Sequence, residues 1–404
     1  MRSCFMIVGD ADCSFTANEM PYLSQTFQEV HIFAYNSLPD AKLQVDFPKN
    51  VVIHHLGVIK GFARLIRYVS KGLFCREPDL AVKTLHPNRI LTSLYSRGRA
   101  EAVYQQILSI IAKEQILVQN GVVYSYWFTD QAIVAWRLAE ELRRRGGKFK
   151  SVSRAHGYDL YWERNCARYL PFQDISLKHL DGVFPCSAVG RDYLCRKYPK
   201  YVNNLHIARL GTYEHGLGPV PQKGECSFVT CSRLDGNKRV SLFAAAFCEL
   251  RRKRFNCHWY CIGDGVERSK VEAIIASAEA RSAVTMLGQL SNEEVVSFYK
   301  ENPIDYFVNV SLSEGVPVSI MEAMSFGIPV IATDVGGTSE LVSEDCGKLL
   351  NSDITTEELE EALESELIAK PEAYAQKRKN ARSVWEKVSS AEMNYHKWCN
   401  LLVN

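Results

Sequence analysis

The sequence lacks any run of 18 consecutive apolar residues, so we expect no helix that spans a membrane. Its first residues also lack the long apolar stretch and the small-residue cleavage site of a secretory signal. No CxxC pair occurs among its 13 cysteines, which disfavours a structural zinc site and indicates reduced, mostly buried thiols. Together these absences predict a cytoplasmic protein.

An excess of charge of one sign is also missing, because 48 Lys and Arg face 46 Asp and Glu and leave a net charge of +2. This balance excludes a chain built as a whole to hold nucleic acid, and we expect no nucleic-acid partner. What is present is typical of a globular protein, since 47% of the residues are hydrophobic and 23% are charged. A chain of 404 residues is long enough for two domains.

Short apolar runs alternate with helical patterns along the whole chain. We expect twelve strands, at residues 4–8, 30–34, 51–55, 122–128, 151–154, 183–186, 228–231, 258–262, 284–287, 306–310, 330–332 and 348–350. In the first half, helices are expected near residues 17–27, 61–73, 98–113 and 131–145. This alternation predicts an α/β protein with two Rossmann-like, doubly wound parallel sheets.

The segment 211–225, GTYEHGLGPVPQKGE, holds four Gly and two Pro without an apolar period, and we expect it to link two domains. The N-terminal domain would then cover residues 1–210 and the C-terminal domain residues 226–375. The polar helical stretch 376–404 leaves open a return to the first domain. Two such domains would face a cleft, and ligands should bind there because open parallel sheets bind ligands at the carboxyl ends of their strands.

The most informative segment runs from Ser311 to Leu341 and reads SLSEGVPVSIMEAMSFGIPVIATDVGGTSEL. An expected strand ends there in a Ser-rich loop, and Pro317 is expected at the first position of a helix, where a missing N–H costs nothing. The free N–H groups at such a helix end form an anion site. Glu314 would lie at the mouth of this helix and Glu322 deeper, and a carboxylate can accept the paired hydroxyls of a sugar or ribose. The alternative is two solvated carboxylates on an amphipathic helix.

Three further groups follow expected strands. Arg233 and Lys238, in CSRLDGNKRV, suit a diphosphate because Arg is a flat fork of donors and Lys a point charge, although ordinary surface charge is the alternative. His156, in SRAHGYDLYWER, can reach into the cleft as a donor or acceptor, although a structural His is the alternative. The glycines of IGDG, residues 262–265, let the backbone approach a ligand closely.

Four motifs appear in one order along the chain: R-L-x-x-x-K, G-D-G, E-x7-E in its E-G-x-P form, and G-G-x-x-E-L. With them the chain resembles a family 4 retaining glycosyltransferase of the GT-B fold. The resemblance is dense from residue 226 to residue 350 and scattered, but in order, through the first half.

The resemblance implies a role for each matching residue. Arg233 and Lys238 would bind the diphosphate of a nucleotide sugar, and Glu322 would hold the ribose hydroxyls of the nucleotide. Glu314 would lie against the donor sugar near the reacting carbon, and His156 would contact the same sugar. The backbone that would hold the hydroxyls of that sugar follows Glu314: Gly315, Val316 and Pro317.

One loop departs from the family pattern. Many relatives have a Gly-rich loop after the first strand that touches the donor phosphate and the acceptor, whereas this chain reads GDADCSFTANEMPYL, similar to a polysaccharide-building subgroup. The resemblance therefore assigns no acceptor contacts here. The string Asp10-Ala11-Asp12 could hold Mg²⁺ or Mn²⁺, but no other ligand set accompanies it and members of this family need no metal. We expect neither a metal nor a cofactor.

The sequence thus predicts a metal-independent, retaining hexosyl- or glycosyltransferase. It would move a sugar from a nucleotide diphosphate sugar to a polysaccharide or lipid-linked glycan acceptor. Negative charge grows on the diphosphate as an oxocarbenium-like state forms, and fixed cations and a helix end would stabilise that charge. Two alternatives stay open: a nucleotide-sugar epimerase or hydrolase of the same fold, which needs no acceptor, and a catalytically silent scaffold in polysaccharide assembly.

The stretch 60–74, KGFARLIRYVSKGLF, divides sharply when it is wound at about 100° per residue. Lys60, Arg64, Arg67 and Lys71 fall on one stripe, and apolar residues fall opposite. Such a helix either lies on anionic lipid or packs its apolar face on the sheet while its basic face meets water. A basic stripe stays exposed in both cases, so we expect peripheral attachment to the inner face of a membrane.

Overall fold

The computed structural model describes residues 2–10, 14–35, 47–57, 61–73, 86–165, 167–221, 224–368 and 370–404. The chain divides into two compact units, which we call the N-terminal unit (Met1–Arg209 with Tyr395–Asn404) and the C-terminal unit (Leu210–Asn394). Each unit contains one six-stranded sheet. Within the described ranges, no helix is both long and apolar enough to cross a membrane.

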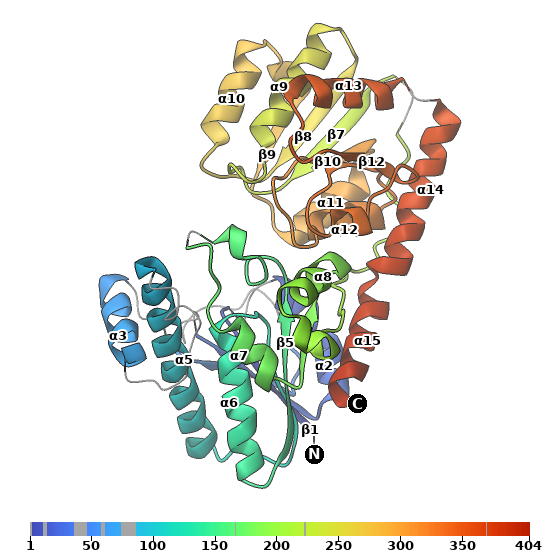
Figure 1. Ribbon diagram of the computed structural model, residues 1–404. Coiled ribbons are helices and arrows are strands. Elements are labelled where there is room, and N and C mark those ends of the chain that lie inside the picture. The colour runs from blue at the N-terminus through green and yellow to red at the C-terminus, as the bar shows by residue number, and fades with distance from the viewer. Residues whose placement is uncertain are drawn as a thin grey trace. The chain divides into compact units, whose positions relative to one another are not determined.

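The N-terminal sheet has the strand order β3-β2-β1-β4-β5-β6, and all its strand pairs are parallel (Figure 1). Its strands are β1 (Arg2–Val8), β2 (Glu29–Ala34), β3 (Val51–His55), β4 (Asn120–Ser125), β5 (Lys148–Ala155) and β6 (Gly182–Pro185). The helices of this half of the chain are α1 (Ser14–Ala17), α2 (Met20–Thr26), α3 (Gly61–Leu73), α5 (Pro87–Lys113), α6 (Asp130–Arg144), α7 (Gln173–His179) and α8 (Ala188–Lys197). The last helix, α15 (Ala391–Val403), packs mostly in this unit.

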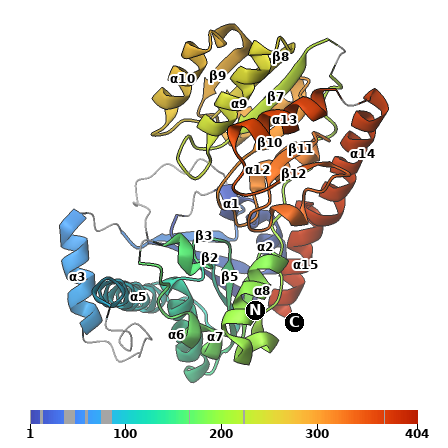
Figure 2. The ribbon, with the colours of Figure 1, turned by 45° about the horizontal axis from the view of Figure 1, so that its top comes forward.

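Successive side chains of β1 enter two different cores, as the two-residue period of a strand requires. Phe5 and Ile7 pack with residues of α5, α6 and α7. Cys4, Met6 and Val8 pack on the other face with residues of α2 and α15. Figures 1 and 2 show these helices on opposite sides of the sheet. The expected sheet with helices on both faces is therefore confirmed.

Helix α3 packs against α5 through two glycines. A Cβ atom at Gly72 would lie 2.0 Å from the carbonyl oxygen of Leu94, and one at Gly98 would lie 1.7 Å from that of Tyr68. The two backbones therefore touch, and only glycine leaves room for this contact. Ile66 and Leu73 of α3 remain 56% and 64% exposed, so α5 covers only part of its apolar face.

The C-terminal sheet has the strand order β12-β11-β10-β7-β8-β9, again with parallel pairs throughout. Its strands are β7 (Cys226–Cys231), β8 (Cys257–Ile262), β9 (Val284–Gly288), β10 (Tyr306–Asn309), β11 (Val330–Thr333) and β12 (Gly347–Leu350). Its helices are α9 (Val240–Arg252), α10 (Arg268–Ser277), α11 (Asn292–Glu301), α12 (Val318–Ser325), α13 (Thr356–Leu367) and α14 (Pro371–Val388). Each of the twelve strands overlaps an expected one.

In both sheets the first strand of the unit lies beside its fourth, so that β1 adjoins β4 and β7 adjoins β10. The strand order reverses at these points, and open α/β sheets bind ligands at such a reversal, beyond the carboxyl ends of the strands. In the C-terminal unit, the loops after β7 and β10 meet there. These loops contain most of the residues singled out in the sequence.

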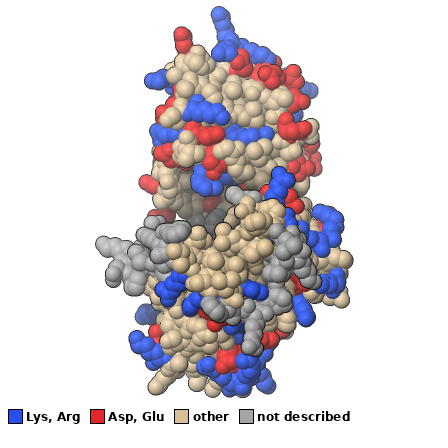
Figure 3. Space-filling model, turned by 60° about the vertical axis from the view of Figure 1, so that its left-hand side comes forward, with Lys and Arg blue, Asp and Glu red and all other residues tan. Residues whose placement is uncertain are grey.

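The segment expected as a linker is extended and packs on the C-terminal unit. Thr212 forms an isolated bridge with Ser390, and the guanidinium of Arg378 donates hydrogen bonds to the carbonyls of Gly218 and Pro219 at 3.2 and 3.3 Å. On the described part of the face drawn in Figure 3, Lys and Arg side chains are interspersed with Asp and Glu over both units.

Candidate active site

Hydrogen bonds hold the loop after β7 against the loop after β10. The side-chain amide of Asn237 donates to the carbonyl of Ser313 at 3.1 Å, and the backbone N–H of Leu312 donates to the carbonyl of Asn237 at 2.7 Å. Within the first loop, a carboxylate oxygen of Asp235 accepts the N–H groups of Asn237 and Lys238, both at 3.1 Å. This turn fixes the backbone from which the Lys238 side chain extends.

Lys238 and Glu314, taken from different loops, form an ion pair at the strand reversal. The Lys238 Nζ lies 2.6 Å from the Glu314 Oε1, and the side chains are only 19% and 10% exposed. Asn309 at the end of β10 donates to the same oxygen at 3.3 Å. The structure therefore brings together two residues that lie 76 positions apart in the chain.

Glycines of the G-D-G and G-G-x-x-E-L motifs pack closely against the backbone of these loops. At Gly336, which has a φ of +59°, a Cβ atom would lie 1.9 Å from the carbonyl oxygen of Glu314. Gly337 donates its N–H to the carbonyl of Gly315 at 2.7 Å. At Gly263 a Cβ atom would lie 1.8 Å from the carbonyl oxygen of Ser232. The close approach predicted for Gly263 is thus to a neighbouring protein loop.

Arg233 does not join the Lys238–Glu314 pair. Its side chain is 81% exposed and lies 3.3 Å from a carboxylate oxygen of Asp235. Arg233 follows β7 as predicted, but its side chain extends into solvent. Of the two cations predicted to bind a diphosphate, Lys238 is largely buried in an ion pair and Arg233 is exposed.

Helix α12 begins one residue later than predicted. Pro317 has an extended backbone conformation, with ψ of 108°, and its carbonyl accepts the N–H of Ile320 at 3.1 Å, so it is the N-cap and not the first helical residue. No side chain of the described chain caps this helix end. The first N–H groups of α12 are therefore available to an anion or a polar ligand.

Glu322 is a half-buried carboxylate on α12. Burial raises its pKa from 4.5 to about 7, although a hydrogen bond from the side-chain amide of Asn292, at 2.7 Å, acts in the other direction. Burial raises the pKa of Cys231 to about 12, and the negative charge of the nearby Glu322 contributes to this rise. Glu322 thus lies by the end of β7, close to where Cys231 leads into the Arg233–Lys238 loop.

Asn292 is a site residue that the motifs did not reveal. It begins α11, next to a capping box in which Ser291 and Glu294 satisfy each other's backbone N–H groups. The S-x-x-E spacing at 291–294 predicts the start of a helix. Nothing in that spacing predicts that the first side chain of the helix reaches Glu322, because the contact depends on how α11 packs beside α12.

His156 lies in the N-terminal unit, directly after β5. Its ring stacks on Tyr126 at a centroid distance of 4.6 Å and lies against Trp127 at 4.7 Å. Its Nδ1 is 3.7 Å from the Asp159 Oδ2, which is too long for a hydrogen bond. Both ring nitrogens are buried, and neither has a hydrogen-bond partner among the described residues.

Asp159 holds the backbone around His156 in place. Its carboxylate accepts the N–H groups of Phe128 and His156 at 2.8 Å and that of Gly157 at 3.0 Å. Burial alone would raise the pKa of Asp159, but its interactions with His156 and the backbone N–H groups outweigh burial and lower it. Sequence reasoning missed this residue, although H-x-x-D is visible in HGYD.

Arg154, on β5 two residues before His156, forms a buried ion pair with Glu19. Tyr124 donates to Glu19 at 3.2 Å, and the Arg154 guanidinium lies 4.7 Å from the ring centre of Trp398 on α15. Burial raises the pKa of Glu19, while the charge of Arg154 opposes that rise. Of the Asp10-Ala11-Asp12 string, residues 11 and 12 lie outside the described residues.

Residues 220–384 match a family described as "Glycosyl transferases group 1". This region is related to the group 1 glycosyltransferases. The match covers β7 to α14 and so includes Lys238, Glu314 and Glu322.

A match to one curated relative is longer than this group 1 region. The putative colanic acid biosynthesis glycosyltransferase WcaL of Escherichia coli is 24% identical over 246 residues, which cover 59% of this chain and 60% of that protein. The chain spans 21%, 38% and 60% of the length of the first three curated relatives that it matches.

Solved structures match the whole chain. Sucrose-phosphate synthase from Thermosynechococcus elongatus superposes with a TM-score of 0.73 at 17% identity, over 99% of this chain and 98% of that one. Anabaena Alr3699/HepE in complex with UDP gives a TM-score of 0.68 at 12% identity, over 100% of both chains. With the two parallel sheets, these likenesses confirm the GT-B fold class predicted from the sequence.

Proposed function

We propose that this protein is a retaining glycosyltransferase that moves a sugar from a nucleoside diphosphate sugar to a polysaccharide or lipid-linked glycan acceptor. The observation that carries the proposal is the Lys238–Glu314 pair, which is held at the reversal of the C-terminal sheet beside the free end of α12. A cation, a carboxylate and a row of backbone N–H groups are what a diphosphate joined to a sugar requires.

Each residue of the proposed site has its own role. Lys238 meets the diphosphate and offsets the charge that grows on it as the glycosidic bond breaks, and Arg233 turns in from solvent to assist. Glu314 and the backbone of Gly315, Val316 and Pro317 hold the donor sugar. Lys238 is fixed beside Glu314 before the donor arrives, so a cation already lies at the proposed site when charge develops on the diphosphate.

Glu322 holds the ribose of the nucleotide, and His156 contacts the donor sugar. A carboxylate can accept two neighbouring hydroxyls, and the ring nitrogens of His156, which are buried and make no hydrogen bond with the described residues, keep the capacity to bond a sugar hydroxyl. Among the solved structures, Alr3699/HepE was crystallised in complex with UDP, which supports a uridine nucleotide as the first donor to test. We propose that no metal takes part, so that chelation by EDTA leaves transfer unchanged.

Nucleotide binding tests the site directly. We expect UDP to stabilise the protein by about 2.7 kcal/mol at a concentration about 100-fold above its dissociation constant. Replacement of Lys238 by Gln should weaken UDP binding about tenfold or more, since a hydrogen bond to a charged group is lost, and should leave uridine binding unchanged. Lys300→Gln, on the exposed side of α11, is the matched control and should bind both ligands as the wild type does.

Turnover separates transfer from the alternatives. In the presence of a donor and an oligosaccharide acceptor, a retaining transferase gives a product with the anomeric configuration of the donor, which NMR reads directly. Release of free sugar at the same rate without an acceptor would instead favour hydrolysis. No nucleotide binding and no turnover with any donor would leave the scaffold as the better interpretation.

We also propose that the protein works in the cytoplasm and touches the inner face of a membrane through α3. That helix exposes Arg64 and Arg67 on one stripe and the apolar Ile66 and Leu73 on another, and anionic lipid attracts helices that present both kinds of side chain. Lys60 lies outside the described residues. Arg64→Glu with Arg67→Glu should abolish co-sedimentation with anionic vesicles, and undiminished co-sedimentation of that variant contradicts the proposal.

A further inference from the structure

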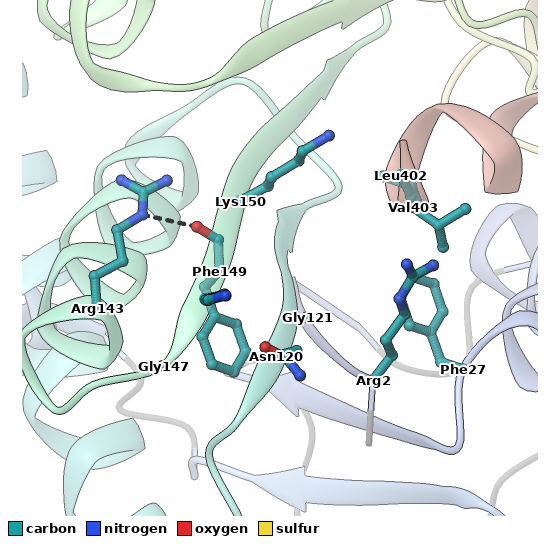
Figure 4. Close-up of a pocket in the computed structure, with 11 residues that line it drawn as sticks. Arg2, Phe27, Asn120, Gly121, Arg143, Gly147, Phe149, Lys150, Leu402 and Val403 are labelled. Atoms are coloured by element: carbon teal, nitrogen blue, oxygen red, sulfur yellow. Dashed lines mark hydrogen bonds between the residues drawn. The ribbon is translucent and has the colours of Figure 1, made fainter.

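A cavity of about 620 Å³ lies at the amino edge of the N-terminal sheet, where β1, β4 and β5 begin (Figure 4). Its volume is in the range of small-molecule sites. Lys148 opens β5 at this edge, and His156 follows the same strand at the other edge. At about 3.3 Å per residue, they lie roughly 25 Å apart, so the cavity is separate from the candidate active site.

The charged residues around this cavity are all basic. They are Arg2 on β1, Arg143 near the end of α6, and Lys148 and Lys150 on β5. Arg143 is already engaged, since it donates to the carbonyl of Phe149 at 2.7 Å and forms an ion pair with Asp181. Among the described residues, no carboxylate lies within ion-pair distance of Arg2, Lys148 or Lys150. Three cations therefore border the cavity without a counter-charge from the described part of the chain.

The rest of the lining is largely apolar. Phe27, Phe149 and Leu402 are buried side chains that line it, and Val403 at the end of α15 is half-buried. Figure 4 shows Arg2 and Phe27 on one side together with Val403, and Phe149, Lys150 and Arg143 on the other. An occupant thus meets apolar side chains and cations in the same space.

The equivalent edge of the other sheet differs. A cavity of about 430 Å³ at the amino edge of the C-terminal sheet is lined by Glu225, Asp305 and Glu366 as well as by Arg378. Burial raises the pKa of Asp305, and the N-terminal cavity has no such acidic lining residue. A lining of cations alone is therefore a property of this one cavity and does not follow from the sheet architecture.

We propose that the amino-edge cavity binds an anionic amphiphile, a molecule with a phosphate or carboxylate head and an apolar chain. The head lies among Arg2, Lys148 and Lys150, and the chain lies on the α2 and α15 side of the cavity, against Phe27, Leu402 and Val403. The ligand binds as a single molecule, because the site is a concave cavity and not an exposed apolar face. This site is independent of the proposed transfer reaction.

Octyl phosphate, below the concentration at which it aggregates, is a suitable probe for calorimetric titration of the full chain. We expect it to bind, and we expect inorganic phosphate and octanol at the same concentration not to bind, since each carries only half of the recognised chemistry. Lys148→Gln with Lys150→Gln should weaken octyl phosphate binding about tenfold or more. Lys113→Gln with Lys178→Gln, at exposed positions elsewhere in the unit, should bind as the wild type does.

Each other result overturns the proposal. If inorganic phosphate binds as tightly as octyl phosphate, the apolar side chains do not contribute to recognition. If the Lys148/Lys150 variant binds octyl phosphate as tightly as the wild type, the ligand binds elsewhere. Binding to vesicles of anionic phospholipid without binding of the monomer would indicate a membrane surface. UDP binding by the same variant, which should be unchanged, shows that the protein is folded and keeps this result separate from the proposed transferase activity.

Discussion

Burial of Glu322 changes its acidity, and the sign of that change has two consequences. Its pKa is about 7 in the folded protein and 4.5 ordinarily, so the folded state favours the protonated form. The folded protein therefore loses stability as the pH rises from 4.5 to about 7, where an unfolded chain would already be ionised. A ribose, by contrast, donates its hydroxyls best to the ionised form.

We therefore expect UDP affinity to rise with pH through about 7. A group with that pKa goes from about one tenth ionised at pH 6 to about nine tenths at pH 8, and a ligand that needs the ionised form should bind about tenfold more tightly over that range. Glu322→Gln should remove the part of this rise that Glu322 causes. Any part that comes from the titration of UDP should persist, so the variant is also the control. Isothermal titration at pH 6, 7 and 8 gives the three constants. An equally steep rise in the variant would exclude Glu322 as its cause.

At the scale of single elements, the contact between α3 and α5 depends on the absence of a side chain at Gly72 and Gly98. In an ordinary helix, replacing Gly by Ala stabilises by roughly 0.5–1 kcal/mol. At Gly98 the added methyl would lie 1.7 Å from the carbonyl oxygen of Tyr68, so the helices must move apart.

Gly98→Ala is accordingly expected to lower the free energy of unfolding by about 1–3 kcal/mol, the usual cost of overpacking. Urea denaturation followed by circular dichroism measures it. Ser109→Ala, on the exposed side of the same helix, controls for helix propensity and should be neutral or slightly stabilising. If the Gly98 variant were as stable as this control, the backbone contact between α3 and α5 would be contradicted.

Elements were predictable from the sequence where one local pattern decides them. Each buried parallel strand is a short apolar run with turn residues at its ends, and all twelve could be located that way. The helix expected at 98–113 instead begins at Pro87, because α5 has buried residues along its whole length, including Ser93 and Ser96, which give no clear amphipathic signal. The predicted strand 122–128 ends at Ser125, although the apolar run continues beyond it with Tyr126 and Phe128, which are buried in the loop, and the partly buried Trp127.

The candidate site also contains residues that a local sequence pattern indicates and residues that it does not. Lys238, Glu314 and Glu322 stand in motifs whose spacing predicts loops and a helix end, so their neighbourhood followed from the sequence. Asn292 and Asp159 did not follow, because each acts through a contact between elements that no local spacing encodes.

At the scale of the whole molecule, the chain leaves the N-terminal unit at residue 209 and returns to it at residue 395. The returning helix α15 covers one face of the N-terminal sheet with Trp398, which is 1% exposed. The Trp398 ring meets Tyr124 at 5.3 Å and Phe184 at 4.9 Å, and the buried Arg154 guanidinium lies 4.7 Å from it. Trp398, Cys399 and Leu402 therefore belong to the core of a unit whose other residues come from the first half of the chain.

This arrangement predicts two thermal transitions that respond to different changes. Trp398→Ala should destabilise the N-terminal unit by about 3–5 kcal/mol, since it empties a large buried site and leaves the Arg154 charge beside a cavity. UDP should raise only the transition of the C-terminal unit, where Lys238, Glu314 and Glu322 all lie. Differential scanning calorimetry with and without UDP resolves the two effects.

Lys397→Ala, at the exposed neighbouring position of α15, is the control for Trp398→Ala and should shift neither transition by more than about 0.5 kcal/mol. The assignment of each transition follows from which of the two changes moves it. A single transition that is lowered by Trp398→Ala and raised by UDP would mean that both units unfold together. The last helix would then join the units into one cooperative structure, because α15 begins beside Thr212 in one unit and ends in the core of the other.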